Sequence, residues 1–165
     1  MTKAIQQSAH FGGPPPEELF EMYLDSKKHS EATGGIARMS RKAGGKFTAW
    51  QGQLEGRNIW IVPRKLIVQT WRATHWPPSD PDSILILRFS EAPGGGNVDL
   101  AHENVPEHDH KGVLQGWPKY YWEPWRKHLA QRAKTRSGSK KETTAPRDRK
   151  SQHRLRRTSA RPRTY

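Results

Sequence analysis

The stretch from residue 36 to residue 104 constrains the fold more than any other part of this sequence. It contains six segments rich in Ile, Val, Trp, Phe and Thr, at 36–40, 46–54, 57–62, 65–75, 83–91 and 97–104. Gaps containing Gly or Pro separate them, and most of these gaps are short. Such spacing is typical of strands joined by consecutive hairpins. The stretch therefore predicts an antiparallel meander.

Alternation along these segments predicts which side chains face the core. Successive residues of a strand point to opposite faces of the sheet, so every second residue shares a face. In the segment 83–89, for example, Leu85 and Leu87 lie opposite Ile84 and Ile86. The side chains that we expect to face inward are Trp71, Leu85, Leu87, Phe89, Val98 and Leu100.

Helix signals flank the meander on its amino-terminal side. A weak strand is expected at 4–11, and three prolines at 14–16 then precede Glu17 and Glu18. Proline at a helix start and acids in the first turn favour a short helix through Leu24. A second helical turn is expected over 27–32, ended by the Gly34-Gly35 pair.

A longer helix is expected from about residue 109 onward. Trp117, Tyr121, Trp125 and Leu129 recur every four residues, which places them on one helical stripe. Pro124 lies within this stripe. A proline inside a helix costs about 3 kcal/mol or kinks the helix unless a local bulge absorbs it.

The predicted order is a strand, short helices, six strands and a long helix, which indicates the α+β class. An antiparallel sheet that buries one face needs another element packed on that face. The aromatic stripe of the carboxy-terminal helix can fill this role. We therefore expect a helix-grip architecture, in which a curved sheet wraps around the long helix and two short helices lie near the amino terminus.

Charge and aromatic content divide the chain near residue 130. All seven Trp and all four Phe precede residue 131, whereas residues 131–165 carry 13 Lys and Arg against two acids. A segment with so few apolar residues cannot offset its ordering entropy by burial. The sequence thus predicts one domain over 1–130 and a disordered basic tail over 131–165.

The basic tail has two main interpretations, and a third, binding to a membrane surface, is weakened by the lack of an apolar face. It could contact nucleic acid or another polyanion weakly and without sequence preference, since phosphate contacts by Lys and Arg are electrostatic. It could equally be an extension that only solvates the chain. The candidate polyanion-binding residues are Arg147, Arg149, Lys150, Arg154, Arg156 and Arg157.

The composition argues against several classes of protein. The chain has no cysteine, which excludes disulfides, thiolate zinc sites and a cysteine nucleophile, and fits a reducing, cytoplasmic location. No apolar run approaches 18 residues, so no membrane-spanning segment is expected.

The polar residues give no convincing catalytic or metal site. Ser83, Asp99 and His102 could form a triad, but no nucleophile elbow surrounds any serine. His102, His108 and His110 lack the spacing of a zinc site. We therefore expect no metal and no cofactor, and catalysis is not the favoured interpretation.

Several motifs resemble a known family. The runs GQLEGRNIWIVPRKLIVQTWR at 52–72 and GWPKYYWEPW at 116–125, with Trp76-Pro77-Pro78 between them, are similar to the activator of heat-shock protein 90 ATPase homologues. That family belongs to the START-like (SRPBCC, Bet v-like) superfamily, and the similarity covers roughly residues 4–130. The resemblance implies a helix-grip fold with a cavity between sheet and helix.

The candidate ligand-binding residues are Trp50, Gln69, Trp71, Leu85, Leu87, Trp117 and Tyr121. These side chains could enclose a small apolar or aromatic molecule, since ligand pockets are mostly apolar with a few polar groups. The alternative is that the rings simply fill the core. The first hypothesis is thus a non-catalytic binding module. The resemblance adds a chaperone-associated regulator that acts through its surface and, less favoured, a cyclase or hydrolase.

Overall fold

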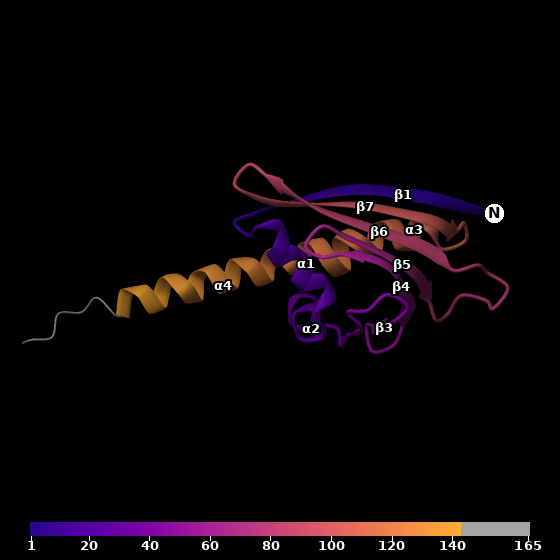
Figure 1. The fold of residues 1–165 in the computed structure, drawn as a ribbon, viewed down its shortest axis with the longest axis horizontal. Coiled ribbons are helices and arrows are strands. Elements are labelled where there is room, and N and C mark those ends of the chain that lie inside the picture. Colours follow the sequence, from indigo (N-terminus) through magenta and orange to yellow (C-terminus); the bar gives the residue numbers. More distant parts are fainter. Residues whose placement is uncertain (143–165) are drawn as a thin grey trace, which may run out of the picture.

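The structure, a computed structural model, describes residues 1–142 and consists of one antiparallel sheet that curves over a long helix (Figure 1). The seven strands lie in the order β1-β7-β6-β5-β4-β3-β2. The elements are β1 (Thr2–Gly12), α1 (Pro16–Leu24), α2 (Ser26–Thr33), β2 (Arg38–Met39), β3 (Lys46–Ala49), β4 (Leu54–Val62), β5 (Leu66–Ala73), β6 (Ser83–Ala92), β7 (Gly95–Pro106), α3 (His110–Trp117), the π-helix η1 (Pro118–Trp122) and α4 (Glu123–Glu142).

The predicted helix-grip architecture is confirmed. Neighbouring strands from β2 to β7 pair in sequence order, and β1 closes the far edge against β7. All of the side chains expected to face inward are buried. They meet the stripe of α3, η1 and α4, in which Trp117, Tyr121 and Trp125 are buried as well. The core is therefore a single layer between the concave face of the sheet and the helices.

The short helices begin and end where the sequence signals lie. Pro16 occupies the first turn of α1, and the acids Glu17 and Glu18 follow it. The side chain of Asp25 caps α2 by accepting a hydrogen bond from the Lys28 backbone N–H at 2.9 Å. Gly34 ends α2 in the left-handed conformation, with φ of 81°. This conformation favours glycine because it has no Cβ.

One predicted turn is misplaced. The sequence suggested a break at residues 55–56, but β4 runs straight through them and the turn lies at residues 50–53. Trp50 and Gln51 adopt positive φ angles of 51° and 55° there, which is uncommon without glycine and hides the turn from pattern reasoning. Gly56 serves close packing instead, because a Cβ on it would lie 1.9 Å from the Thr70 backbone oxygen.

A π-helical segment absorbs the proline in the long helix. In η1 the backbone N–H of Glu123 bonds to the oxygen of Pro118, five residues earlier. A π-turn adds one residue to the helix. It lies just before Pro124, which has no N–H to donate, and both Tyr121 and the off-stripe Trp122 are buried, the first against α1 and α2 and the second against β1. The expected local bulge is therefore present.

The helix extends past the expected domain boundary. α4 continues to Glu142, so the boundary predicted at residue 130 falls inside the helix, which projects beyond the sheet (Figure 1). Residues 126–136 include Ala, Arg, Lys and Gln, which are strong helix formers even where nothing packs on them. The predicted polyanion-binding residues from Arg147 to Arg157 lie outside the described residues, and their role stays a prediction. Among residues 1–142, no helix is long and apolar enough to cross a membrane.

The close approach at Gly56 generates a stability prediction. Replacing Gly56 with alanine forces β4 away from β5, and we expect it to lower the free energy of unfolding by about 2 kcal/mol or more. The matched control is Gly12→Ala, another strand glycine, where a Cβ would have nothing within 4 Å. Denaturant titration of both variants checks this. Equal stability of the two variants would show that β4 can shift without cost.

Candidate functional site

A groove opens between one end of the sheet and the helical segment α3–η1. It encloses about 540 Å³ and is lined by residues from the β3–β4 turn, β5, α3 and η1. The lining residues are Trp50, Gln53, Leu54, Trp71, Ala73, His75, Asp109, Gly112, Val113, Gly116, Trp117, Tyr120 and Tyr121. The volume falls within the usual range for small-molecule sites.

Aromatic rings form most of the groove wall. Trp117 packs against Tyr121 with ring centroids 4.6 Å apart and lies 6.4 Å from Trp71. Across the opening, Trp50 meets Tyr120 edge-on at 5.2 Å. Four of the seven predicted ligand-binding residues thus line one groove, together with Tyr120, which is 43% exposed beside the buried Tyr121.

A small polar edge interrupts this apolar wall. The Asp109 carboxylate accepts a hydrogen bond from the Trp76 indole at 2.7 Å and lies 3.2 Å from His75 Nε2. The Nε1 of Trp50 is buried and meets no well-aligned acceptor among the described residues, although the indole lies close enough to the Tyr121 hydroxyl to act on its pKa. Burial raises the pKa of Tyr121, and the nearby Trp50 indole opposes this only partly, so Tyr121 is neutral. The groove therefore offers flat apolar contact and a few polar groups.

The other three predicted ligand-binding residues lie elsewhere. Leu85 and Leu87 are fully buried core residues that do not line the groove. Gln69 is equally buried and its amide is used by the protein itself. It accepts a hydrogen bond from the Tyr23 hydroxyl at 2.8 Å and donates one to Asn58 at 2.7 Å. Because a buried amide without partners is costly, this chain holds β4, β5 and α1 together.

A second buried polar chain links the sheet to α3. The Trp117 indole N–H donates to Nδ1 of His102 at 3.2 Å, and His102 Nε2 lies 2.8 Å from the Ser83 hydroxyl. An indole N–H can only donate, so the proton of the neutral imidazole is on Nε2. The Ser83 hydroxyl in turn donates to the Trp71 carbonyl at 2.7 Å.

This arrangement differs from a serine–histidine catalytic pair. His102 donates to Ser83 and therefore cannot accept the serine proton. Ser83 is fully buried, and Asp99 is engaged by Ser8 and Asn97 on the opposite face of the sheet. Burial lowers the pKa of His102 to about 3, which keeps it neutral. Ser83 and His102 are therefore in contact, as a triad would require, but their hydrogen bond serves the fold.

His29 is the buried residue that sequence reasoning missed. Its Nδ1 donates to the Tyr23 carbonyl at 2.7 Å, so its Nε2 carries no proton, and that atom has no partner among residues 1–142. Burial lowers the pKa of His29 to about 4, with the Tyr23 bond opposing this. Because His29 lies on the short polar helix α2, the hydrophobic pattern of the sequence did not indicate that it is buried. The ring packs edge-on against Tyr121, with centroids 5.5 Å apart.

The histidines near the β7–α3 loop do not converge. His108 binds Asp80 at 2.6 Å, whereas His110 lies 3.1 Å from the Ala4 carbonyl. Within the described part of the chain, no group of three or more potential ligands is placed to hold a metal ion. What the groove offers is chiefly aromatic surface.

The matching family model and the similar proteins point to the same family. The model for "Activator of Hsp90 ATPase homolog 1-like protein" matches residues 14–130. The human activator of 90 kDa heat shock protein ATPase homolog 1 is 30% identical over 108 residues, which is 66% of this chain and 32% of the human protein. A Dictyostelium discoideum homologue is 23% identical over 104 residues, 63% of this chain and 27% of that protein. The chain thus spans about a third of the length of these relatives.

Solved structures share the fold. An HSP90 activator from Plasmodium falciparum superimposes with a TM-score of 0.66 at 23% identity, covering 79% of this chain and 96% of that one. A Mesorhizobium loti protein gives the same TM-score at 19% identity, covering 78% of this chain and 98% of that one.

The two buried histidines predict acid sensitivity. Both have folded-state pKa values below the ordinary 6.5, so below pH 6.5 the unfolded chain binds protons that the folded chain does not. Their stabilisation is complete above pH 6.5 and is lost as the pH falls toward 4 and then 3, at up to about 1.4 kcal/mol per pH unit for each histidine.

The variant His102→Gln keeps a donor and an acceptor but does not titrate. We expect its unfolding free energy, from denaturant titration between pH 7.5 and 4.5, to fall less steeply with pH than that of the wild type. The matched control is His10→Gln, because His10 is exposed on β1. A His102→Gln slope equal to that of the wild type would mean that His102 is protonated in the fold.

Proposed function

The chain belongs to the family of activator of Hsp90 ATPase homolog 1-like proteins, and on that premise we propose that it regulates ATP turnover by a chaperone of the 90-kDa heat-shock class. The observation that carries this proposal is the 30% identity with the human activator over 108 residues. The region of similarity comprises most of the folded domain. The aromatic and polar residues of the core described above support a rigid binding module.

The proposed regulation predicts a change in chaperone activity. Adding the full chain to a purified chaperone of this class should raise its rate of ATP hydrolysis in a saturable way, because binding must favour the conformation that hydrolyses ATP. A coupled ATPase assay with subtraction of the inhibitor-insensitive rate measures this. An unchanged rate at saturating chain concentration would contradict the proposal.

The groove supports a second candidate function, the binding of a small apolar or aromatic molecule. Five aromatic side chains line it, namely Trp50, Trp71, Trp117, Tyr120 and Tyr121. Flat rings of this kind stack on an aromatic ligand. This function is compatible with the first, because the groove occupies only one end of the domain.

Filling the groove tests this second function. At Gly116 a Cβ would meet only the Tyr120 ring, at 3.6 Å, so Gly116→Leu should fold and project into the groove. We expect the affinity for a fluorescent hydrophobic probe to fall about tenfold, which corresponds to about 1.4 kcal/mol. Gly138→Leu, on the projecting part of α4, is the control and should bind as the wild type does. Equal probe binding by the two variants would place the probe outside the groove.

A further inference from the structure

The face of the sheet that points away from the helices carries an unusual amount of apolar surface. In antiparallel sheets with one wet face, apolar and polar residues normally alternate. On β5 and β6 part of this alternation is lost, because the outward residues Leu66, Val68, Ile84 and Ile86 are apolar. All four are partly exposed, and none of the helices α1–α4 covers them.

The strand register joins part of this surface into one row. Trp60 of β4 pairs with Val68, Val68 pairs with Ile86, and Ile86 pairs with Ala101 of β7. We call Trp60, Val68 and Ile86 the outer row. Directly paired residues on one face have Cβ atoms about 5 Å apart, so the three side chains form continuous apolar surface across three strands. Trp60 is its most prominent member, with 60% of its surface exposed.

A β-bulge is what turns Trp60 outward. Asn58 points inward and bonds to Gln69, and simple alternation would point Trp60 inward as well. The register shift between Asn58 and Trp60 inserts Ile59 as an extra residue, so that Trp60 faces solvent and Ile61 returns to the core side opposite Ile67. Bulges often re-aim a side chain at a functional surface. Here the bulge exposes a tryptophan, whose burial would otherwise be favourable.

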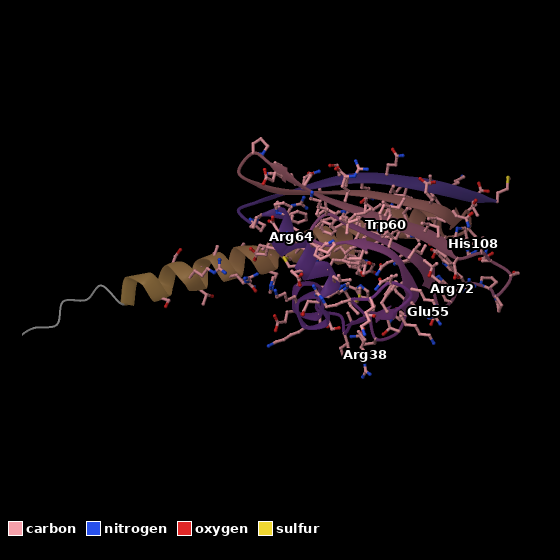
Figure 2. All side chains as sticks on the ribbon, in the orientation of Figure 1. Arg38, Glu55, Trp60, Arg64, Arg72 and His108 are labelled. Atoms are coloured by element: carbon pink, nitrogen blue, oxygen red, sulfur yellow. The ribbon has the colours of Figure 1, made fainter. Side chains whose placement is uncertain are left out.

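Cations border the outer row on both sides along the strands. Arg57 precedes Trp60 on β4, and Arg88 follows Ile86 on the same face of β6. Arg64 lies in the β4–β5 turn (Figure 2). All three are exposed, and none forms an ion pair with a carboxylate among residues 1–142. Acids share this face: Asp99 of β7 lies directly opposite Arg88, but its carboxylate is held by Ser8 and Asn97, and the exposed Glu55 lies two residues before Arg57 on β4.

We propose that the outer row is the surface through which this domain docks on its chaperone, at an apolar patch of the chaperone edged by carboxylates. The inference rests on the regulatory function proposed above and names the surface that performs it. Exposed tryptophan and arginine side chains are the residue types that contribute most to protein–protein binding. The unpaired arginines select an acidic partner and accelerate its association.

The same charges argue against the chain's own carboxy-terminal segment as the occupant. Residues 143–165 contain eight Lys and Arg and one acid, so the arginines around Trp60 would repel them. The outer row also lies on the opposite face of the sheet from the aromatic groove. Substitutions in the row therefore leave the ligand site intact, and the two functions can be tested separately.

The test compares substitutions at two apolar residues that are equally exposed. Trp60→Thr removes the outer row's largest side chain and keeps a residue suited to strands. Ile36→Thr is the matched control, since Ile36 is also 60% exposed but lies in the loop after α2, outside the row. Binding of each full-length variant to the purified chaperone is measured by calorimetry, with the thermal unfolding midpoint as a check on folding.

We expect Trp60→Thr to weaken chaperone binding about tenfold or more and to lose ATPase stimulation in parallel, with an unchanged unfolding midpoint. Trp60→Phe should recover part of the affinity, Arg57→Glu should slow association most at low salt, and Ile36→Thr should behave as the wild type. Wild-type binding by Trp60→Thr would overturn the docking surface while the regulatory function stands. No binding by the wild type would overturn the regulatory function, and the assigned partner with it.

Discussion

The packing of an aromatic helical stripe against the concave face of a single sheet is the interaction on which the rest of this structure depends. Trp117, Tyr121, Trp122 and Trp125 all lie on the buried side of α3, η1 and α4. Tyr121 and Trp122 are adjacent and diverge around the helix axis, so different elements bury them: Tyr121 packs on α1 and α2, and Trp122 packs on β1. The π-turn just before Pro124 accommodates a residue that has no N–H to donate within this broad aromatic face.

The two hydrogen-bonded chains fix how the helices sit on the sheet. Apolar packing alone tolerates sliding and rotation, whereas a buried donor without an acceptor is costly. The His102 chain ties α3 to three strands through Trp117, and the Gln69 chain ties α1 to β5 and β4. Because Trp117 is also a wall of the groove, the shape of the groove depends on the protonation and tautomer of a histidine that no ligand would touch.

The parts of the fold that follow from the spacing of apolar residues were predictable from the sequence. The strands, the inward set such as Leu85 and Leu87, and the aromatic stripe obey periods of 2 and 3.6 residues, which burial enforces. The turn at residues 50–53 was not, since Trp50 and Gln51 adopt left-handed angles that tertiary packing must impose. The hydrogen bonding of the Gln69 amide was not predictable either, because its partners Tyr23 and Asn58 are distant in sequence.

The outer row also shows what alternation along a strand cannot predict. Alternation correctly separates Ile86 from Leu87, but it cannot say that Trp60 and Asn58, two residues apart, face opposite ways. That reversal depends on one inserted residue in β4, which in turn is held by the hydrogen bonds of Asn58 beneath the sheet. The buried polar chain and the exposed tryptophan are thus coupled through the bulge: the core side chain that anchors β4 also determines which apolar side chain the domain presents to a partner.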